Sequence, residues 1–174
     1  MGGRGKTALL AVIAAAAVAA LVVFGLRPSG AHRTGRPAPG LPSEHLGGAA
    51  VTLPKLLARA GGHPSFVVFW ASWCGPCATE APALEAFSRT AAGRGRIVGV
   101  DWSDGRSAAL AFIRRFGWTF PTLRDGEGLV GNKYEMTGLP TTFVLDGRGR
   151  IAATLRGPQS ATSLSAALRA AERA

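Results

Sequence analysis

Apolar and polar residues follow one another along this chain in stretches of different length. The longest apolar stretch is residues 8–26, which carry no charge and have basic residues on both sides. Residues 27–43 come next, are rich in Pro, Gly and small polar residues, and show no apolar period, which is typical of a flexible linker. From residue 44 onward short apolar runs alternate with polar ones, so residues 44–174 are expected to form one folded domain.

The pattern of this domain predicts alternating strands and helices. Residues 66–70 (FVVFW) are apolar without interruption, which is typical of a strand buried on both faces, and residues 97–102 are a second such candidate. Residues 146–149 (DGRG) predict a hairpin turn between two further strands. The remaining expectations are strands at residues 49–53, 141–145 and 150–156, helices at 55–60, 75–92, 107–116 and 161–171, and a short segment around 129–134. This order predicts the α/β class, with a central mixed β-sheet flanked by helices on both faces.

Residues 8–26 are long enough to cross a membrane. As a helix they would span about 28 Å at about 1.5 Å per residue, close to the roughly 30 Å of a bilayer core. A cleaved signal peptide is the alternative, because residues 29–31 (SGA) offer a small-x-small cleavage site. Apolar regions of signal peptides usually have about 7–15 residues, so the length favours a transmembrane signal-anchor, while cleavage stays open.

The flanking charges leave the orientation of this segment undecided. Arg4 and Lys6 lie before it, and Arg27, Arg33 and Arg36 lie after it, so the positive-inside rule favours neither side. We expect residues 1–7 in the cytoplasm and the folded domain on the extracytoplasmic side of the cell membrane, which is the simplest arrangement for an N-terminal anchor.

The formal net charge is +10, which first suggests an anionic partner. The basic residues are scattered, however, and aromatic residues are not interleaved with them as in a nucleic-acid-binding face. We therefore expect no nucleic-acid partner.

The chain has two cysteines, and both lie in Cys74-Gly75-Pro76-Cys77. This motif follows a predicted strand and begins a predicted helix, where unpaired backbone N–H groups and the helix dipole stabilise a thiolate. Cys74 is therefore expected to be the nucleophile, and Cys77, one turn further on, to resolve the mixed disulfide. Pro76 lacks an N–H at a position where that donor would have no partner, and Gly75 allows the sulfurs to approach closely.

Other uses of two cysteines fit less well. A zinc site needs two more ligands, but the histidines, His32, His45 and His63, are isolated and upstream, so no metal is expected. A c-type haem site needs His directly after Cys77, and that residue is Ala78. The two cysteines could also be inert and buried, and this alternative stays open. If they are redox-active, we expect the Cys74–Cys77 disulfide to be the redox group and no further cofactor to be needed.

Two segments of the chain resemble the thioredoxin superfamily. Residues 69–77 (FWASWCGPC) resemble its active-site segment, and residues 138–143 (GLPTTF) resemble its cis-proline loop. The resemblance implies a thioredoxin-like fold with a cis Leu139–Pro140 bond opposite the cysteines. It also implies a substrate-binding site, made of Trp73, Gly75, Pro76, Gly138, Leu139 and Pro140. Trp70, Trp102 and Trp118 are expected in the core.

The chain is more closely similar to the membrane-tethered TlpA, ResA and CcmG (DsbE) branch. The shared features are Glu80-x-Pro82, Phe120-Pro121, Asp125-Gly126 and residues 141–146 (TTFVLD). In that branch an acid at the place of Glu80 assists proton transfer at the cysteines, so Glu80 is a third candidate catalytic residue. The alternative is an ordinary exposed glutamate near a helix start. Thioredoxin itself has a buried aspartate where this chain has Val68.

The resemblance implies an extracytoplasmic thiol-disulfide oxidoreductase that acts on exported proteins, such as a reductase of apocytochrome c in cytochrome c maturation. Its expected partners are exported protein thiols or disulfides and a membrane thiol transporter as electron donor, and the protein is expected to be a monomer. Two alternatives stay open: an oxidase that forms disulfides in exported proteins, and a non-catalytic anchored peptide-binding redox sensor. The Gly-Pro pair between the cysteines favours a reductase, although two residues do not fix the direction of electron flow.

Overall fold

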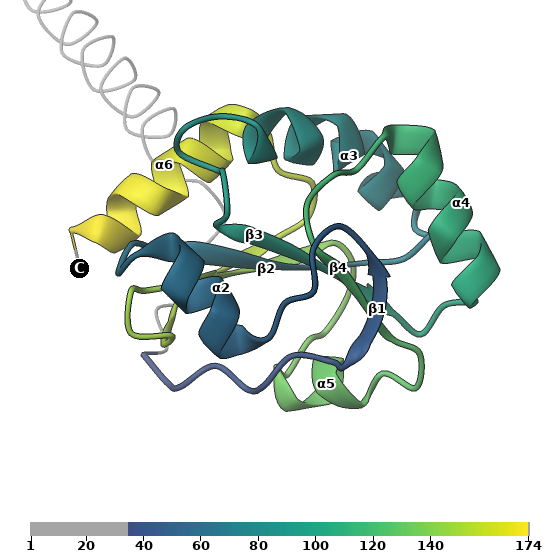
Figure 1. Cartoon of the computed structure of the whole chain (residues 1–174), viewed down its shortest axis with the longest axis horizontal. Coiled ribbons are helices and arrows are strands. Elements are labelled where there is room, and N and C mark those ends of the chain that lie inside the picture. Colours follow the sequence, from purple (N-terminus) through teal and green to yellow (C-terminus); the bar gives the residue numbers. More distant parts are fainter. Residues whose placement is uncertain (1–34, 174) are drawn as a thin grey trace, which may run out of the picture. The chain divides into compact units, whose positions relative to one another are not determined.

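A computed structural model of the chain describes residues 35–173 (Figure 1). The predicted cytoplasmic residues 1–7, the predicted anchor at residues 8–26 and the first part of the predicted linker lie outside the described residues. Within residues 35–173, no helix is both long and apolar enough to span a bilayer.

The domain has a six-stranded sheet and five helices within its described part. The strands are β1 (Glu44–Gly47), β2 (Ser65–Trp70), β3 (Ile97–Trp102), β4 (Thr122–Asp125), β5 (Thr141–Leu145) and β6 (Ile151–Arg156), and the helices are α2 (Leu53–Ala60), α3 (Gly75–Ser88), α4 (Arg106–Phe116), α5 (Leu129–Lys133) and α6 (Ala161–Glu172). The strand order is β1-β4-β3-β2-β5-β6, with β4, β3 and β2 parallel and the other neighbours antiparallel. The expected mixed sheet is therefore confirmed.

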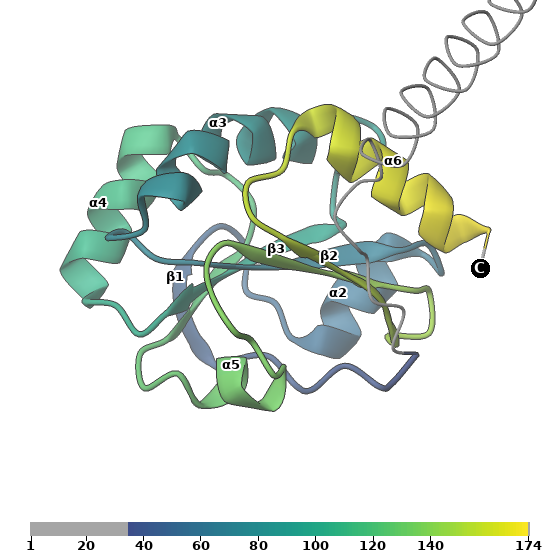
Figure 2. The same cartoon turned by 180° about the vertical axis from the view of Figure 1, so that it is seen from behind.

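Helices cover both faces of this sheet, as expected. Helices α3, α4 and α6 lie on one face, and α2 and α5 lie on the other (Figures 1 and 2). Each face has its own apolar core, and β2 contributes to both: Phe66, Val68 and Trp70 face α3, while Val67 and Phe69 face the other way. Every residue of β2 is buried, so the strand that leads into the cysteine motif is held from both sides.

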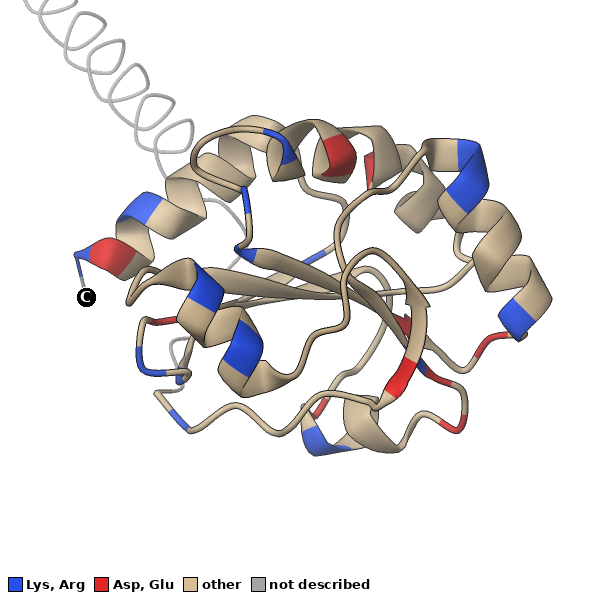
Figure 3. Ribbon diagram, in the orientation of Figure 1, with Lys and Arg blue, Asp and Glu red and all other residues tan. Residues whose placement is uncertain are grey.

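The charged residues are dispersed over the fold. Figure 3 shows Lys and Arg on α2, α4 and α6 rather than gathered on one element. The scatter of basic residues along the sequence is therefore also a scatter in space over these helices.

The first strand is not where the sequence suggested. Residues 49–53 were expected to form it, but β1 lies at Glu44–Gly47 and pairs with β4, a strand that the sequence reading missed. Thr52 instead begins α2, because its side-chain Oγ1 accepts a hydrogen bond from the Lys55 N–H at 3.4 Å. Helix α3 ends at Ser88, four residues before the predicted end, and the chain then turns with Thr90 N–H donating to the Phe87 carbonyl.

The described part of the predicted linker is attached to the domain. Gly35 N–H donates to the Ile151 carbonyl, and Ile151 N–H donates to the Arg36 carbonyl, both at 2.8 Å. Farther along, the Tyr134 hydroxyl donates to the Pro39 carbonyl at 2.8 Å. Residues 35–39 therefore form an extension along β6 and the end of α5, which a composition rich in Pro and Gly did not suggest.

Candidate active site

The cysteine motif lies where β2 ends and α3 begins. Cys74 is the N-cap residue of α3 in an extended conformation, and its Sγ accepts a hydrogen bond from the Cys77 N–H at 3.2 Å. The two cysteines form a disulfide. In the reduced protein the same N–H and the helix dipole would stabilise a thiolate on Cys74, which is the local arrangement that makes a cysteine nucleophilic.

The two sulfurs differ in their surroundings. Both are buried, Cys74 at 5% exposed and Cys77 at 1%, but Cys74 lines a cleft of about 530 Å³ and Cys77 is not among the residues that line it. Trp73, next to Cys74, is 60% exposed. This difference fits attack on a substrate by Cys74 and a later, internal attack by Cys77.

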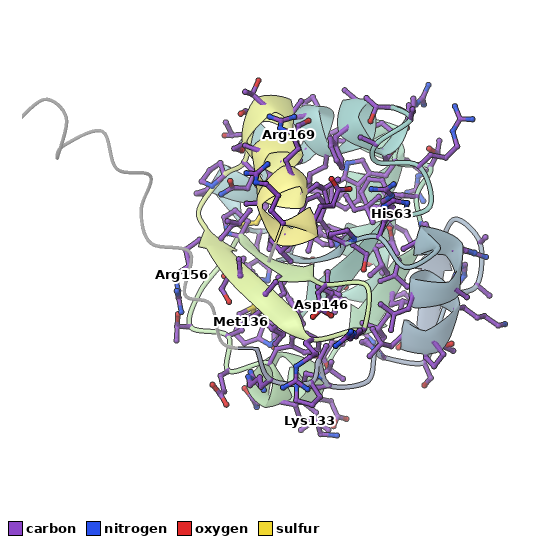
Figure 4. All side chains as sticks on the ribbon, turned by 90° about the vertical axis from the view of Figure 1, so that its left-hand side faces the viewer. His63, Lys133, Met136, Asp146, Arg156 and Arg169 are labelled. Atoms are coloured by element: carbon purple, nitrogen blue, oxygen red, sulfur yellow. A yellow bond between two sulfur atoms is a disulfide. The ribbon has the colours of Figure 1, made fainter. Side chains whose placement is uncertain are left out.

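The cleft brings together residues that are far apart in the sequence. Its walls are Trp73, Cys74, Gly75, Pro76, Trp102, Met136, Thr137, Gly138 and Leu139. Five of the six residues expected to bind substrate are among them, and the sixth, Pro140, is buried directly behind Leu139. Figure 4 shows Met136 on the same side of the sheet as Lys133 of α5, and Arg169 of α6 on the opposite side.

The loop opposite the cysteines has the conformation that the resemblance implied. The Leu139–Pro140 bond is cis. The Pro140 carbonyl accepts a hydrogen bond from Gly157 N–H at 2.9 Å, and the Thr141 hydroxyl donates to the Gly138 carbonyl at 2.7 Å. These bonds attach the loop to β5 and to the end of β6, so Leu139 is held at the edge of the cleft.

Glu80 is not an exposed surface residue. It is 2% exposed, and its Oε2 accepts a hydrogen bond from the Gln159 N–H at 2.8 Å. Its Oε1 has no hydrogen-bond partner among the described residues. Burial raises the pKa of Glu80 to about 7, and the Gln159 hydrogen bond lowers it only in part. A carboxyl that changes protonation near pH 7, one turn after Cys77, has the properties of a proton acceptor for that thiol.

The tryptophans expected in the core divide into two groups. Trp70 and Trp118 are buried and pack edge to face with ring centroids 4.8 Å apart. Trp102, by contrast, is half-buried and forms part of the cleft, so its expected place in the core was only partly correct. Its side chain lies on the face of β3 opposite Asp101, because neighbouring residues of a strand point to opposite faces.

Two acids near the cysteine motif were not predicted from the sequence. Asp101, at the end of β3, is fully buried, and burial raises its pKa to about 8. Asp104, in the loop after β3, accepts a hydrogen bond from the Ser72 N–H at 2.6 Å. The available signal was an acid within an otherwise buried strand, which is rare unless the acid has a partner or a function. Within residues 35–173, no cluster of His, Cys, Asp and Glu suits a metal ion.

A known protein family matches most of this arrangement. The family model described as AhpC/TSA matches residues 34–154, which make up more than half of the chain. The chain belongs to the AhpC/TSA family. The matched segment contains both cysteines, Glu80 and the cis-proline loop.

Individual relatives of this AhpC/TSA chain support the more specific resemblance. A thiol:disulfide interchange protein DsbE homolog of Paracoccus denitrificans is 38% identical over 125 residues, which cover 71% of this chain and 66% of that protein. The thiol-disulfide oxidoreductase ResA of Geobacillus kaustophilus is 33% identical over 97 residues, which cover 55% of this chain and 56% of that protein. The chain thus spans less than two thirds of the length of these relatives.

A solved structure confirms the fold. A thiol:disulfide interchange protein of the thioredoxin family from Chlorobium tepidum superposes with a TM-score of 0.67 at 26% identity, covering 81% of this chain and 99% of that one. The thioredoxin-like fold expected from the sequence is therefore present.

Proposed function

We propose that this protein is a thiol-disulfide oxidoreductase that exchanges disulfides with exported proteins through Cys74 and Cys77. The observation that carries the proposal is the disulfide at the N-terminus of α3, with Cys74 on a cleft whose other wall is the cis-proline loop. The names of the relatives, thiol:disulfide interchange protein and thiol-disulfide oxidoreductase, support the same chemistry.

The reaction begins with the reduced protein. The Cys74 thiolate attacks one sulfur of a substrate disulfide, so that a bond between Cys74 and the substrate forms, the substrate S–S bond breaks, and the leaving thiolate takes up a proton. Cys77 then loses its proton and attacks the Cys74 Sγ, which forms the Cys74–Cys77 disulfide and releases the second substrate sulfur as a thiol. The substrate gains two electrons, and the protein is oxidised.

Glu80 is the group that can accept the Cys77 proton. Because burial places its pKa near 7, a substantial fraction is ionised at neutral pH and able to accept a proton from the resolving thiol. Cys77 itself is almost inaccessible to water, so an internal acceptor matters more here than it would at an exposed thiol.

The surroundings of the cleft suit an extended peptide. Trp73, Trp102, Met136 and Leu139 give it apolar walls, and Gly138 and Leu139 line it together with Cys74. A substrate strand that pairs with this backbone would present its cysteine to Cys74. Apocytochrome c, whose haem-binding cysteines must be reduced before haem attachment, is the substrate we propose, with a membrane thiol transporter as electron donor.

The extracytoplasmic location is part of the proposal. It is supported by the apolar run at residues 8–26, which is long enough for an anchor. An alkaline extraction of membranes, combined with protease accessibility of the domain in intact spheroplasts, tests it. Release of the domain by alkali would show that the anchor is absent.

The activity is tested by reduction of insulin in the presence of dithiothreitol, followed as turbidity. We expect the full-length wild type to accelerate the reaction and Cys74→Ser to abolish the acceleration. Equal rates for the two proteins would refute catalysis and favour the binding-module alternative. The direction is tested by equilibrating the protein with glutathione: a reduction potential near about −270 mV indicates a reductase, and one near about −120 mV an oxidase.

A further inference from the structure

The loop after β3 holds the two residues that precede Cys74. The Ser72 N–H donates to Asp104 Oδ2 at 2.6 Å, and the Trp73 indole Nε1–H donates to the Ser103 carbonyl at 3.3 Å. Both bonds cross from one loop to another, with about thirty residues between the partners. The backbone that places Cys74 at the start of α3 is therefore attached to residues 103 and 104.

This loop is in turn attached to the sheet. Arg124 of β4 donates two hydrogen bonds to the Asp104 carbonyl, from Nε at 3.2 Å and from Nη2 at 2.8 Å. The third nitrogen of the same guanidinium donates to Glu44 of β1 at 3.0 Å, and Arg106 at the start of α4 also donates to Glu44. Asp104 thus has a fixed backbone, and its side chain accepts from the Ser72 N–H through Oδ2 and from the Gly105 N–H through Oδ1, the latter at 2.7 Å.

Asp101 lies beside this arrangement without the partners that a buried carboxylate needs. It is 0% exposed, and neither of its oxygens has a hydrogen-bond partner in any part of the chain that the structure describes. On the sheet it stands between Trp70 of β2 and Arg124 of β4. The Arg124 Nε is 3.9 Å from Asp101 Oδ2, too far for a hydrogen bond.

The charged groups around Asp101 favour its protonated form. Burial raises the pKa of Asp101, the nearby Asp104 raises it further, Arg124 opposes the increase, and Glu44 adds to it, with the result at about 8. Burial also acts on Asp104, but the hydrogen bonds from Ser72 and Gly105, together with the neighbouring Asp101 side chain, outweigh it and lower the pKa of Asp104. At neutral pH these interactions therefore favour the state in which Asp101 is protonated and Asp104 is ionised.

We propose that Asp104 is a positioning residue for Cys74, and that protonated Asp101 donates to the Asp104 carboxylate and keeps it aligned on the Ser72 N–H. Loss of the Asp101 proton places two carboxylates next to each other, which repel and weaken this alignment. The reactivity of Cys74 then has a pH-dependent step that belongs to neither thiol. The inference rests on the proposed role of Cys74 as nucleophile.

The proton on Asp101 is tested in the oxidised full-length protein, where the cysteines do not titrate. Labelling only the aspartates at the carboxyl carbon leaves Glu80 silent, so an NMR titration follows Asp101, Asp104, Asp125 and Asp146 alone. We expect one carboxyl to titrate near pH 8, as the Asp101 pKa of about 8 implies, and this signal to be missing in Asp101→Asn. If every aspartate titrates below about pH 5, close to an ordinary aspartate, the proposal is overturned.

The positioning role is tested by the rate at which iodoacetamide alkylates Cys74 in a Cys77→Ser background. We expect Asp104→Ala to slow alkylation at pH 7 by about threefold to tenfold, since a hydrogen bond to a charged acceptor is lost. Asp104→Asn keeps an oxygen for the Ser72 N–H and should restore most of the rate. Glu127→Ala, which removes an exposed acid from the loop after β4, is the matched control and should leave the rate unchanged.

The pH profile separates the two acids. The ionisation of Cys74 itself, and any step produced by Glu80, remain in both proteins. The contribution of Asp101 is therefore the difference between the wild-type and Asp101→Asn profiles, which should be largest near pH 8. The proposal is refuted by an unchanged rate in Asp104→Ala, by no rescue in Asp104→Asn, or by wild-type and Asp101→Asn profiles that coincide around pH 8. Failure of the proposed function is recognised separately, because the insulin assay with Cys74→Ser does not depend on either aspartate.

Discussion

Replacing Glu80 by Gln measures how much stability the folded protein loses when the buried Glu80 carboxyl ionises. Glutamine has nearly the same shape, its oxygen can still accept the Gln159 N–H, and it never carries a charge. Below pH 4.5 wild type also has a neutral side chain here in both the folded and the unfolded chain, because the ordinary pKa is 4.5 and the folded pKa is about 7. The two proteins should therefore have similar stability in acid.

The difference appears as the pH rises. Between pH 4.5 and about 7 the unfolded chain releases the Glu80 proton while the folded chain retains it, so wild type loses stability with rising pH. A shift of this size corresponds to about 3 kcal/mol at about 1.4 kcal/mol for each unit. Above pH 7 both states are ionised and the loss stays constant. Glu80→Gln should thus be more stable than wild type by about 3 kcal/mol at pH 8 and by much less at pH 4.5.

Urea unfolding of the oxidised proteins at several pH values measures this difference. Keeping the disulfide intact holds the cysteines out of the titration, and Glu127→Gln, at an exposed position, controls for the loss of one surface charge. A stability difference that stays within about 0.5 kcal/mol between pH 4.5 and 8 would refute the argument, because a carboxyl that ionises freely inside the fold has no desolvation cost. In the reduced protein, the same variant should slow release of the mixed disulfide near pH 7.

Three further changes test the cleft and its support. Trp73→Ala should leave the free energy of unfolding within about 0.5 kcal/mol, because the side chain is 60% exposed, but raise the KM for a peptide disulfide. Gly147→Ala should destabilise the domain by about 1–3 kcal/mol in urea unfolding, because the new methyl group would lie 1.9 Å from the Gly62 carbonyl oxygen. Trp118→Phe removes the buried indole hydrogen bond to the Ala81 carbonyl and should cost about 1–3 kcal/mol by the same measurement. A normal KM in Trp73→Ala would contradict a role of Trp73 in binding substrate. Unchanged stability in Gly147→Ala or in Trp118→Phe would contradict the close contact with Gly62 or the hydrogen bond to Ala81, respectively.

The sequence predicted the elements that bury a clear apolar pattern. Residues 66–70 are apolar without interruption and form β2, and the Asp-Gly-Arg-Gly turn appears where expected, with Asp146 Oδ1 accepting from the Arg148 and Arg150 N–H groups. Strands β1 and β4 were not found, because each has four residues and mixed polarity, and their pairing at the edge of the sheet is decided by distant neighbours.

The candidate site also has parts that the sequence predicted and parts that it did not. The cysteine motif and the cis-proline loop have local signatures, so their positions could be named in advance. The burial of Glu80 could not, because it results from the Gln159 loop, which follows 79 residues later. The pairing of Asp104 with Ser72 likewise depends on two loops that meet only when β2 and β3 lie side by side.

This protein has two buried acids near its cysteines, Glu80 and Asp101, whereas thioredoxin has one on the strand before its cysteines. That position is Val68 here, on the face of β2 that packs under α3. Glu80 lies on the helix that carries Cys77, and Asp101 lies on the strand next to β2. Asp104, in the loop that follows this strand, accepts from Ser72 before Cys74, and we propose that Asp101 acts through Asp104. If each acid serves the cysteine to which it is connected, Glu80→Gln should affect resolution and Asp101→Asn should affect attack. In the double variant, each of the two rate constants should then change by the same factor as in the corresponding single variant, because the two routes share no hydrogen bond.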